Sequence, residues 1–195
     1  MDAGVPLVLI GPMASGKSAV GRMLAHRTGL RFLDSDREIT ERHGPISAIF
    51  AEQGEPVFRA LESGVIAAAL EGGGGVVVAL GGGAVLDAGT RALLTRATVV
   101  LLETDLATVR PRISGDTGRP LLAGRAEERW QEIHDERRPL YEAVASEVVD
   151  TRGLSVREVV EAVLRVIHTG QQVDGTDATP TTSSNDERRK REVHP

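Results

Sequence analysis

The stretch LIGPMASGKSAVG, residues 9–21, decides the fold, because two glycines, a lysine and a serine follow directly after an aliphatic run. The residues that match the pattern G-x-x-x-x-G-K-[ST] are Gly11, Gly16, Lys17 and Ser18. In such a loop the backbone N–H groups cradle phosphates, the lysine reaches the terminal phosphates, and the hydroxyl can bind Mg²⁺. The pattern also arises by chance, so the segments on either side of it decide its meaning.

Both flanking segments fit a phosphate-binding loop. VPLVLI (5–10) predicts a buried strand, and SAVGRMLAHRTG (18–29) predicts a helix that ends at Gly29. A helix N-terminus favours an anion, since its free N–H groups and its dipole both point at the ligand. Lys17 is also the only lysine before Lys190, in a chain whose other basic residues there are arginines. We therefore expect a nucleotide-binding protein.

The composition limits the class of protein. With 195 residues, of which 41% are hydrophobic, the chain can bury one core, and a single domain is expected. Aromatic residues make up 3% and the net charge is −5, which argues against a nucleic-acid partner. The sequence has no cysteine, and no early stretch resembles a secretion signal or a membrane span. We expect a cytoplasmic monomer without nucleic-acid or membrane partners.

Short apolar runs alternate with longer helical segments, which predicts a parallel sheet with right-handed helical connections. The near-continuous apolarity of VVVAL and TVVLL is typical of strands buried on both faces. We predict a three-layer α/β/α sandwich around five parallel strands, whose carboxyl ends carry the ligand site. The expected strands are residues 5–10, 31–34, 75–80, 97–102 and 147–150.

The composition changes after His168, where apolar periodicity stops and Thr, Ser, Gly and Asp become frequent. Residues 1–168 therefore form the expected folded domain, and residues 169–195 are expected to be a polar, disordered tail. The basic run ERRKRE in this tail is nearly cancelled by its acids, which favours a solvated end over a nucleic-acid patch.

Two carboxylates follow the second predicted strand, in LDSD at residues 33–36. Because alternate residues of an extended segment face the same way, Asp34 and Asp36 can point into one cleft. One could assist Mg²⁺ and the other accept a hydrogen bond from a substrate hydroxyl. They could instead start a helix, with Ser35 or Asp36 as its cap. Both interpretations stay open, although the nearby phosphate loop favours the first. No acid directly follows VVVAL, where the usual Walker-B aspartate would stand, so Asp34 is the best candidate to replace it as a Mg²⁺ partner.

Two motifs surround the third predicted strand. PVFRALESGVIAAAL (56–70) predicts a helix with Arg59 and Glu62 on one face, where an ordinary surface ion pair is the simplest interpretation. After the strand comes LGGGAV, whose three glycines at 81–83 allow the backbone to approach a ligand closely. A flexible loop is the alternative, but EGGGG before the strand already provides one.

Prolines, glycines and arginines are mixed in RPRISGDTGRPLLAG, residues 110–124. This composition predicts a mobile, positively charged lid over the nucleotide, at about residues 110–126. Its arginines are Arg110, Arg112 and Arg119.

A second group of arginines lies in DERRPLY, where Arg137 and Arg138 precede Pro139. The proline is expected to end or kink a helix there. The two arginines could bind an anionic substrate group, or they could complement the dipole at the helix end.

Six segments together resemble the shikimate kinase family of P-loop enzymes: GPMASGKS, LDSD, FRALE, LGGGAV, RPLL and RRPLY. They occur in this order, at family-like spacing, over residues 5–168. The resemblance implies transfer of the γ-phosphoryl of ATP, with Mg²⁺, to the 3-hydroxyl of shikimate in chorismate and aromatic amino acid biosynthesis. Positioning and electrostatics dominate such a transfer.

The resemblance also implies roles for individual residues, with Asp36 contacting the accepting hydroxyl and two arginines clamping the shikimate carboxylate. The implied catalytic residues are Lys17, Asp36 and Arg119. Nucleotide contacts are implied for Ala14, Ser15, Gly16, Lys17, Ser18, Ala19, Arg110, Arg119 and Arg152, and metal contacts for Ser18 and Asp34. Shikimate contacts are implied for Asp36, Arg59, Glu62, Gly81, Gly82, Gly83 and Arg137.

The sequence departs from the family pattern at Ala14, where the family usually has a further glycine. An alanine fits there only with a negative φ, which we therefore expect. The loop around Arg152 also matches poorly in length. Arg137 is preferred to Arg138 as the carboxylate ligand, because the family spacing is R-x-P-L-Y.

Three other functions compete with this interpretation. A gluconate kinase would share the phosphate loop and the lid, but it needs no arginine pair for a cyclic acid. A GTP-dependent switch would need an N-K-x-D or T-K-x-D motif to recognise guanine. The only asparagine, Asn185, and the only lysine besides Lys17, Lys190, both lie in the tail, so neither motif can form in the folded domain. A catalytically inactive nucleotide-binding regulator stays open, since sequence alone does not separate it from an enzyme.

Overall fold

The computed structural model describes residues 4–72, 75–113 and 125–173. It contains a five-stranded sheet in the order β2-β3-β1-β4-β5, and every neighbouring pair is parallel. The strands are β1 (Leu7–Ile10), β2 (Arg31–Asp34), β3 (Val76–Ala79), β4 (Thr98–Glu103) and β5 (Glu147–Asp150). The predicted five-stranded parallel sheet is confirmed, with strand ends within two residues of those expected.

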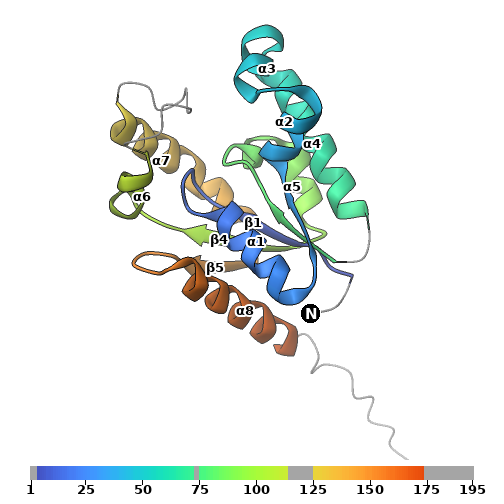
Figure 1. Cartoon of the computed structure of the whole chain (residues 1–195), viewed down its shortest axis with the longest axis vertical. Helices are drawn as coiled ribbons and strands as arrows, with labels where there is room; N and C mark the ends of the chain where they lie inside the picture. The colour runs from blue at the N-terminus through green and yellow to red at the C-terminus, as the bar shows by residue number, and fades with distance from the viewer. Residues whose placement is uncertain (1–3, 73–74, 114–124, 174–195) are drawn as a thin grey trace, which may run out of the picture.

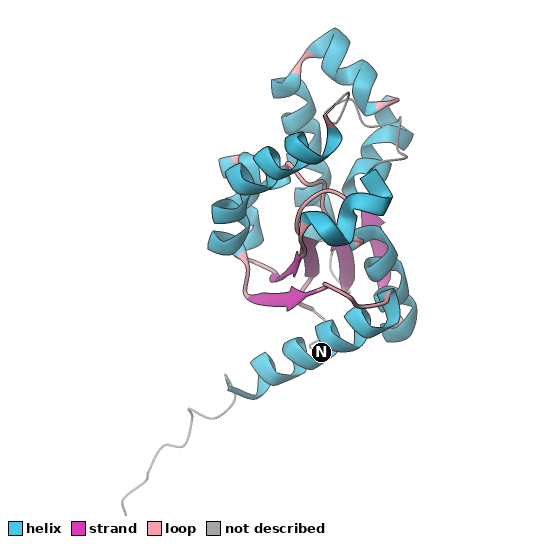
Figure 2. Ribbon diagram, turned by 90° about the vertical axis from the view of Figure 1, so that its left-hand side faces the viewer, coloured by secondary structure: helices cyan, strands magenta, loops and turns pink. Residues whose placement is uncertain are grey.

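Helices cover both faces of this sheet, as Figures 1 and 2 show. They are α1 (Lys17–Thr28), α2 (Ser35–His43), α3 (Ile46–Gln53), α4 (Glu55–Glu71), α5 (Ala88–Leu94), α6 (Leu106–Ile113), α7 (Ala126–Val144) and α8 (Val156–Val173), with a 3₁₀ turn η1 (Ala84–Leu86). Helices α1 and α8 pack on one face, while α4, α5 and α7 pack on the other. The predicted three-layer sandwich is therefore confirmed.

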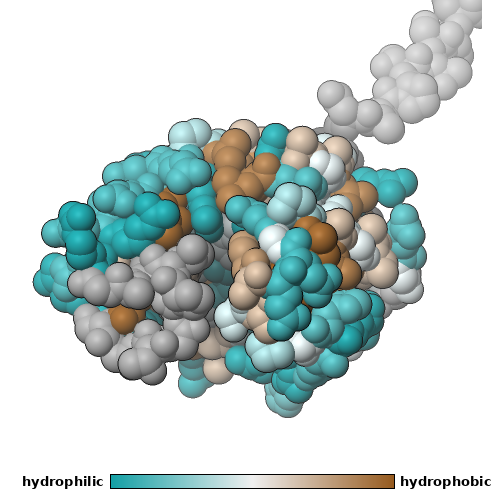
Figure 3. All heavy atoms as spheres, turned by 90° about the horizontal axis from the view of Figure 1, so that it is seen from above, coloured by the Kyte–Doolittle hydropathy of each residue, from teal (hydrophilic) through white to brown (hydrophobic). Residues whose placement is uncertain are grey.

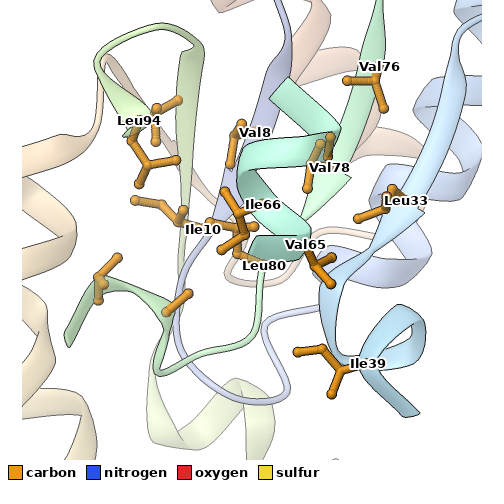
Figure 4. Close-up of a cluster of buried hydrophobic side chains, with 14 of the residues drawn as sticks. Val8, Ile10, Leu33, Ile39, Val65, Ile66, Val76, Val78, Leu80 and Leu94 are labelled. Atoms are coloured by element: carbon orange, nitrogen blue, oxygen red, sulfur yellow. The ribbon is translucent and has the colours of Figure 1, made fainter. Parts of the chain in front are cut away.

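Two cores form because alternate residues of a strand face opposite sides of a sheet. In β1, Val8 and Ile10 point towards α4 and α5, and Leu7 and Leu9 point towards α1 and α8. All four side chains are at most 3% exposed. Figure 4 shows the first core, in which Val8 and Ile10 lie beside Ile66 of α4. Burial on both faces explains why these strands read as continuous apolar runs.

Helix α1 begins and ends on glycines in the left-handed region. Gly16, its N-cap, has φ 96°, and Gly29, its C-cap, has φ 71°. Gly29 is where the sequence predicted the helix to end. Both positions suit glycine, since a Cβ makes positive φ costly.

Three helix boundaries differ from those expected. Helix α8 continues to Val173, five residues past the expected domain end at 168, because extending a helix already formed costs little. Helix α7 continues through Pro139, since Ile133 and Tyr141 bury side chains on both sides of it. Residues 110–113 of the expected lid belong to α6, and residues 114–124 lie outside the described part of the chain. Within the described ranges, no helix is long and apolar enough to cross a membrane.

Candidate active site

A cleft of about 1070 Å³ opens at the carboxyl ends of the strands, as the parallel topology predicts. One wall is formed by the loop between β1 and α1 together with α6, and the other by α2, α3, α4 and the loop after β3. Figure 3 looks onto this end of the molecule, where the surface is hollowed between the two sides. The cleft thus joins the phosphate loop to the carboxylates and arginines predicted from sequence.

The glycines of the phosphate loop are required by its geometry. Gly11 has φ 141°, and a Cβ there would lie 2.6 Å from the carbonyl oxygen of Leu102. Gly16, at φ 96°, turns the chain into α1. Lys17 donates from Nζ to the carbonyl oxygens of Gly11 and Pro12, at 2.8 Å each. Its ammonium group is thereby held across the loop, where a phosphate-binding cation belongs.

Ala14 has φ 64°, so the expectation of a negative φ is wrong. An alanine in the left-handed region costs about 1–2 kcal/mol, because its Cβ crowds the following carbonyl. Contacts from distant parts of the chain hold this conformation. Arg112 donates to the carbonyl oxygen of Ala14 at 2.8 Å, and Trp130 donates to that of Met13 at 2.9 Å.

Asp34 contributes both to a helix cap and to the site. Ser18 donates from Oγ to Oδ2 of Asp34 at 2.5 Å, which places the predicted metal pair together. The other oxygen of Asp34 accepts from the N–H of Arg37 at 3.3 Å and caps α2. The N-cap of α2 is therefore Asp34. The alternative prediction, in which Ser35 or Asp36 caps the helix, is wrong. Ser35 is buried, and its Oγ instead accepts from the N–H of Gly81 at 2.9 Å.

Asp36 and Glu62 flank Gly81 so closely that no larger residue fits. A Cβ on Gly81 would lie 2.4 Å from Oδ1 of Asp36 and 2.8 Å from Oε1 of Glu62. Burial raises the pKa of Asp36, and the nearby charge of Asp34 raises it further, against the opposing effect of Lys17 and Arg59. A raised pKa makes this carboxylate a better proton acceptor.

Glu62 is 1% exposed, and its carboxyl group is only half satisfied. Oε2 accepts from Arg59 at 2.6 Å, whereas Oε1 is buried without a hydrogen-bond partner among the described residues. Burial raises the pKa of Glu62 to about 7, although the positive charge of Arg59 lowers it. The pair is therefore more than the ordinary surface ion pair that sequence alone favoured.

Arg59 is held from several sides. It also donates to Glu55 at 3.0 Å and lies over the ring of Phe58, 5.1 Å from the ring centroid. A Cβ on Gly83 would lie 2.5 Å from Nη2 of Arg59. Gly81 and Gly83 both have ordinary negative-φ or extended backbone, so closeness to these side chains is what requires glycine.

The structure separates the two arginines of α7. Arg137 lines the cleft and donates to the carbonyl oxygen of Gly82 at 3.1 Å, and Tyr141 donates to the same oxygen. Arg138 is exposed and pairs with Glu142 at 2.8 Å. The choice of Arg137 from its spacing therefore agrees with its position in the cleft.

Two of the arginines predicted to contact the nucleotide, Arg110 and Arg152, do not line the cleft. Arg110 donates to Glu127 at 2.9 Å, and Arg152 pairs with Asp150 at 2.6 Å. Arg112, which sequence reasoning did not select, lies over the loop instead. Residues two apart on a helix point about 200° apart, so Arg110 and Arg112 cannot both face the loop. Arg119 lies outside the described residues.

The remaining predicted residues of the phosphate loop also lie at the cleft. Ala14, Gly16, Ser18 and Ala19 line it, and Ser15 is buried with Oγ 3.4 Å from Nζ of Lys17. Across the described residues, no group of three His, Asp or Glu side chains could hold a metal ion without further ligands. Any metal here would need phosphate oxygens and water to complete its shell.

A phosphate cradle on one wall and a carboxylate–arginine pocket on the other are what a kinase needs to bring ATP and a small anionic alcohol together. Fold and cleft therefore define a P-loop kinase that acts on a small molecule.

Comparisons with known proteins narrow this class. Residues 13–168 match the family model described as shikimate kinase. A shikimate kinase from Streptomyces coelicolor is 44% identical over 162 residues, which is 83% of this chain and 94% of the relative. The structure of a shikimate kinase from Acinetobacter baumannii in complex with shikimate superimposes with a TM-score of 0.81 at 36% identity, covering 86% of this chain and 94% of that one. The chain belongs to the shikimate kinase family, whose activity is the phosphorylation of shikimate in aromatic biosynthesis.

A gluconokinase from Sinorhizobium meliloti shares the fold, with a TM-score of 0.62 at 20% identity over 90% of this chain and 99% of the other. At this identity the similarity concerns the fold alone. Gluconate kinase was the nearest alternative function considered from the sequence, and the comparisons favour shikimate kinase over it.

Proposed function

We propose that this cleft transfers the γ-phosphoryl group of ATP to the 3-hydroxyl of shikimate, with the residue roles given below. The observation that carries the proposal is the position of Asp36. This carboxylate lines the cleft between the phosphate loop and the pocket of Arg59 and Arg137. An alcohol anchored by its carboxylate on the two arginines would present a hydroxyl to Asp36 and to the phosphate loop together.

On the nucleotide side, residues 14–19 would surround the β- and γ-phosphates with backbone N–H groups and the ammonium group of Lys17. Lys17 would also stabilise the negative charge that spreads over the transferred group. Arg119 keeps its proposed role on that charge, although its position lies outside the described residues. Arg112 is the stronger candidate for a nucleotide contact than Arg110 or Arg152, because it lines the cleft beside the loop.

Ser18 and Asp34 would hold Mg²⁺. A hydroxyl and a carboxylate are oxygen ligands of the kind that this cation prefers, and here the two oxygens lie 2.5 Å apart. When bound, Mg²⁺ would neutralise charge on the phosphates. The other oxygen of Asp34 is fixed by the N–H of Arg37, which orients the carboxylate towards Ser18.

On the acceptor side, Arg59 and Arg137 would bind the shikimate carboxylate, and the loop at 81–83 would close the pocket floor. Glu62 would orient Arg59 through their 2.6 Å contact. As the 3-hydroxyl oxygen bonds to the γ-phosphorus and the bond to ADP breaks, Asp36 would accept the hydroxyl proton. Its raised pKa suits that task, and correct positioning supplies most of the rate.

We propose further that the enzyme works in the cytoplasm, where ATP is available, and that a single chain carries a complete site. The second point is supported by the cleft, since its two walls come from one chain.

The neighbouring arginines of α7 offer a matched test. Arg137→Ala should raise the KM for shikimate roughly tenfold or more, as loss of a charged hydrogen-bond donor does, and leave the KM for ATP unchanged. Arg138→Ala, the control, removes an equal charge one residue along and should leave both constants near those of the parent. An equal rise in the KM for shikimate in both variants would contradict the proposed binding of the shikimate carboxylate by Arg137.

A further inference from the structure

A small apolar cluster lies behind the phosphate loop, away from the sheet. Val109 and Ile113 of α6 and Trp130 of α7 form it, and Met13 and Ala14 of the loop pack against it. Trp130 is 2% exposed, and its ring stacks on His134 with centroids 4.9 Å apart. The chain has a single tryptophan, and the structure buries it beside the nucleotide subsite.

Two adjacent carbonyl groups of the loop are held from this side. Trp130 donates from Nε1 to the oxygen of Met13 at 2.9 Å, and Arg112 donates to that of Ala14 at 2.8 Å. The two donors come from α7 and α6, and they lie 117 and 98 residues away along the chain from the groups that they hold. Between the two held carbonyl groups lies the α-carbon of Ala14, whose φ of 64° an alanine rarely adopts.

The contact of Trp130 fixes a peptide plane as well as a distance. In a trans peptide the C=O and the following N–H point in opposite directions. With the Met13 carbonyl turned towards the indole, the N–H of Ala14 must point away from α7. The left-handed turn at Ala14 is therefore held by a bond that the loop itself does not supply.

We propose that Trp130 is a positioning residue for nucleotide binding: its indole N–H holds the Met13–Ala14 peptide so that the loop keeps its phosphate-binding shape. This inference rests on the proposed binding of ATP by residues 14–19. Of the three buried side chains in this cluster, only that of Trp130 carries a hydrogen-bond donor, and it donates to the loop. Arg112 donates to the next carbonyl group, that of Ala14, but it is also a proposed nucleotide contact. Its substitution would therefore not separate positioning of the loop from direct binding of the nucleotide.

The test uses Trp130→Phe, which keeps an aromatic ring and removes the donor. The KM for ATP and the Kd for ADP, measured by calorimetry, should rise about fivefold, in line with the loss of one buried hydrogen bond. The KM for shikimate should not change. Val109→Ala is the matched control, because it removes volume from the same cluster and should lower the melting temperature without changing nucleotide affinity.

Rescue by a second substitution separates positioning from general damage. Glycine adopts positive φ without the Cβ penalty, so Ala14→Gly should restore most of the lost ADP affinity in Trp130→Phe. The gain in ADP affinity on Ala14→Gly should be larger in Trp130→Phe than in the parent chain, where the indole N–H already holds the loop. Where Trp130→Phe does not fold at the assay temperature, Trp130→Met replaces it, because methionine adapts to an irregular apolar site and has no hydrogen-bond donor.

Unchanged ADP affinity in the folded Trp130 variants would overturn the proposal, as would an equal loss in Val109→Ala or a failure of Ala14→Gly to rescue. A parent chain that binds no ADP would instead refute the nucleotide site itself, and the two failures are therefore distinguishable.

Discussion

Glu62 gives the sharpest quantitative prediction, because burial and an ion pair act on it in opposite directions. Burial raises its pKa from 4.5 to about 7, and Arg59 lowers it by less. A carboxyl group that binds its proton more tightly in the folded state makes the protein less stable as pH rises. The stability cost is absent below about pH 4.5, grows through pH 7, and reaches about 3 kcal/mol above it.

Glu62→Gln removes this titration while keeping the side-chain shape. The attraction between Arg59 and the charged carboxylate is already contained in the pKa of about 7, so only the difference between a neutral Glu62 and a glutamine adds a constant offset. The difference in unfolding free energy between variant and parent should therefore shift by about 3 kcal/mol in favour of the variant from pH 4.5 to pH 8. Urea unfolding across this range measures it.

Glu55→Gln is the control, because Glu55 pairs with the same arginine but is mostly exposed. Because an exposed ion pair contributes about 0–1 kcal/mol, the unfolding free energy of Glu55→Gln should stay within about 1 kcal/mol of the parent throughout the range. A flat difference for Glu62→Gln would refute the reasoning, and a slope of the opposite sign would mean that Arg59 outweighs burial.

Two further substitutions test the two sides of the cleft. Gly83→Ala should displace Arg59, since the new Cβ would lie 2.5 Å from Nη2, and should lower kcat/KM for shikimate roughly ten- to hundredfold. Gly64→Ala, where no other atom of the described chain lies within 4 Å of the new Cβ, should leave kcat/KM unchanged. Equal losses in both variants would contradict the steric argument. Asp34→Asn should raise the Mg²⁺ concentration that gives half-maximal activity roughly tenfold or more. An unchanged Mg²⁺ titration would remove Asp34 from the metal site.

Local patterns predicted the sheet and the phosphate loop because the physical causes are local. Strands buried on both faces read as apolar runs, and a turn that binds phosphate needs glycines at fixed spacing. The glycines at 81–83 were singled out from sequence as a place where the backbone could approach a ligand. The structure shows another reason at Gly81 and Gly83, where a Cβ would collide with Asp36 and Glu62 or with Arg59.

The remaining features depend on contacts between distant segments. The positive φ of Ala14 is held by hydrogen-bond donors from α6 and α7. The sequence near the loop does not indicate these contacts. The choice between Arg110 and Arg112 depends on how α6 is rotated about its axis, and the lid sequence left that rotation undetermined. Tyr141, which shares the Gly82 carbonyl with Arg137, was likewise missed because its role appears only when α7 meets the loop after β3.

The most direct test of the account is a coupled ADP-release assay with ATP and Mg²⁺, comparing shikimate with gluconate for the parent, Asp36→Asn and Arg137→Ala. We predict turnover with shikimate alone, a fall in kcat of roughly 10²–10⁴ in Asp36→Asn, and weakened shikimate binding in Arg137→Ala. Turnover with gluconate, or full activity in Asp36→Asn, would contradict the acceptor site. No turnover with either acid, despite ATP binding, would instead support a nucleotide-binding regulator.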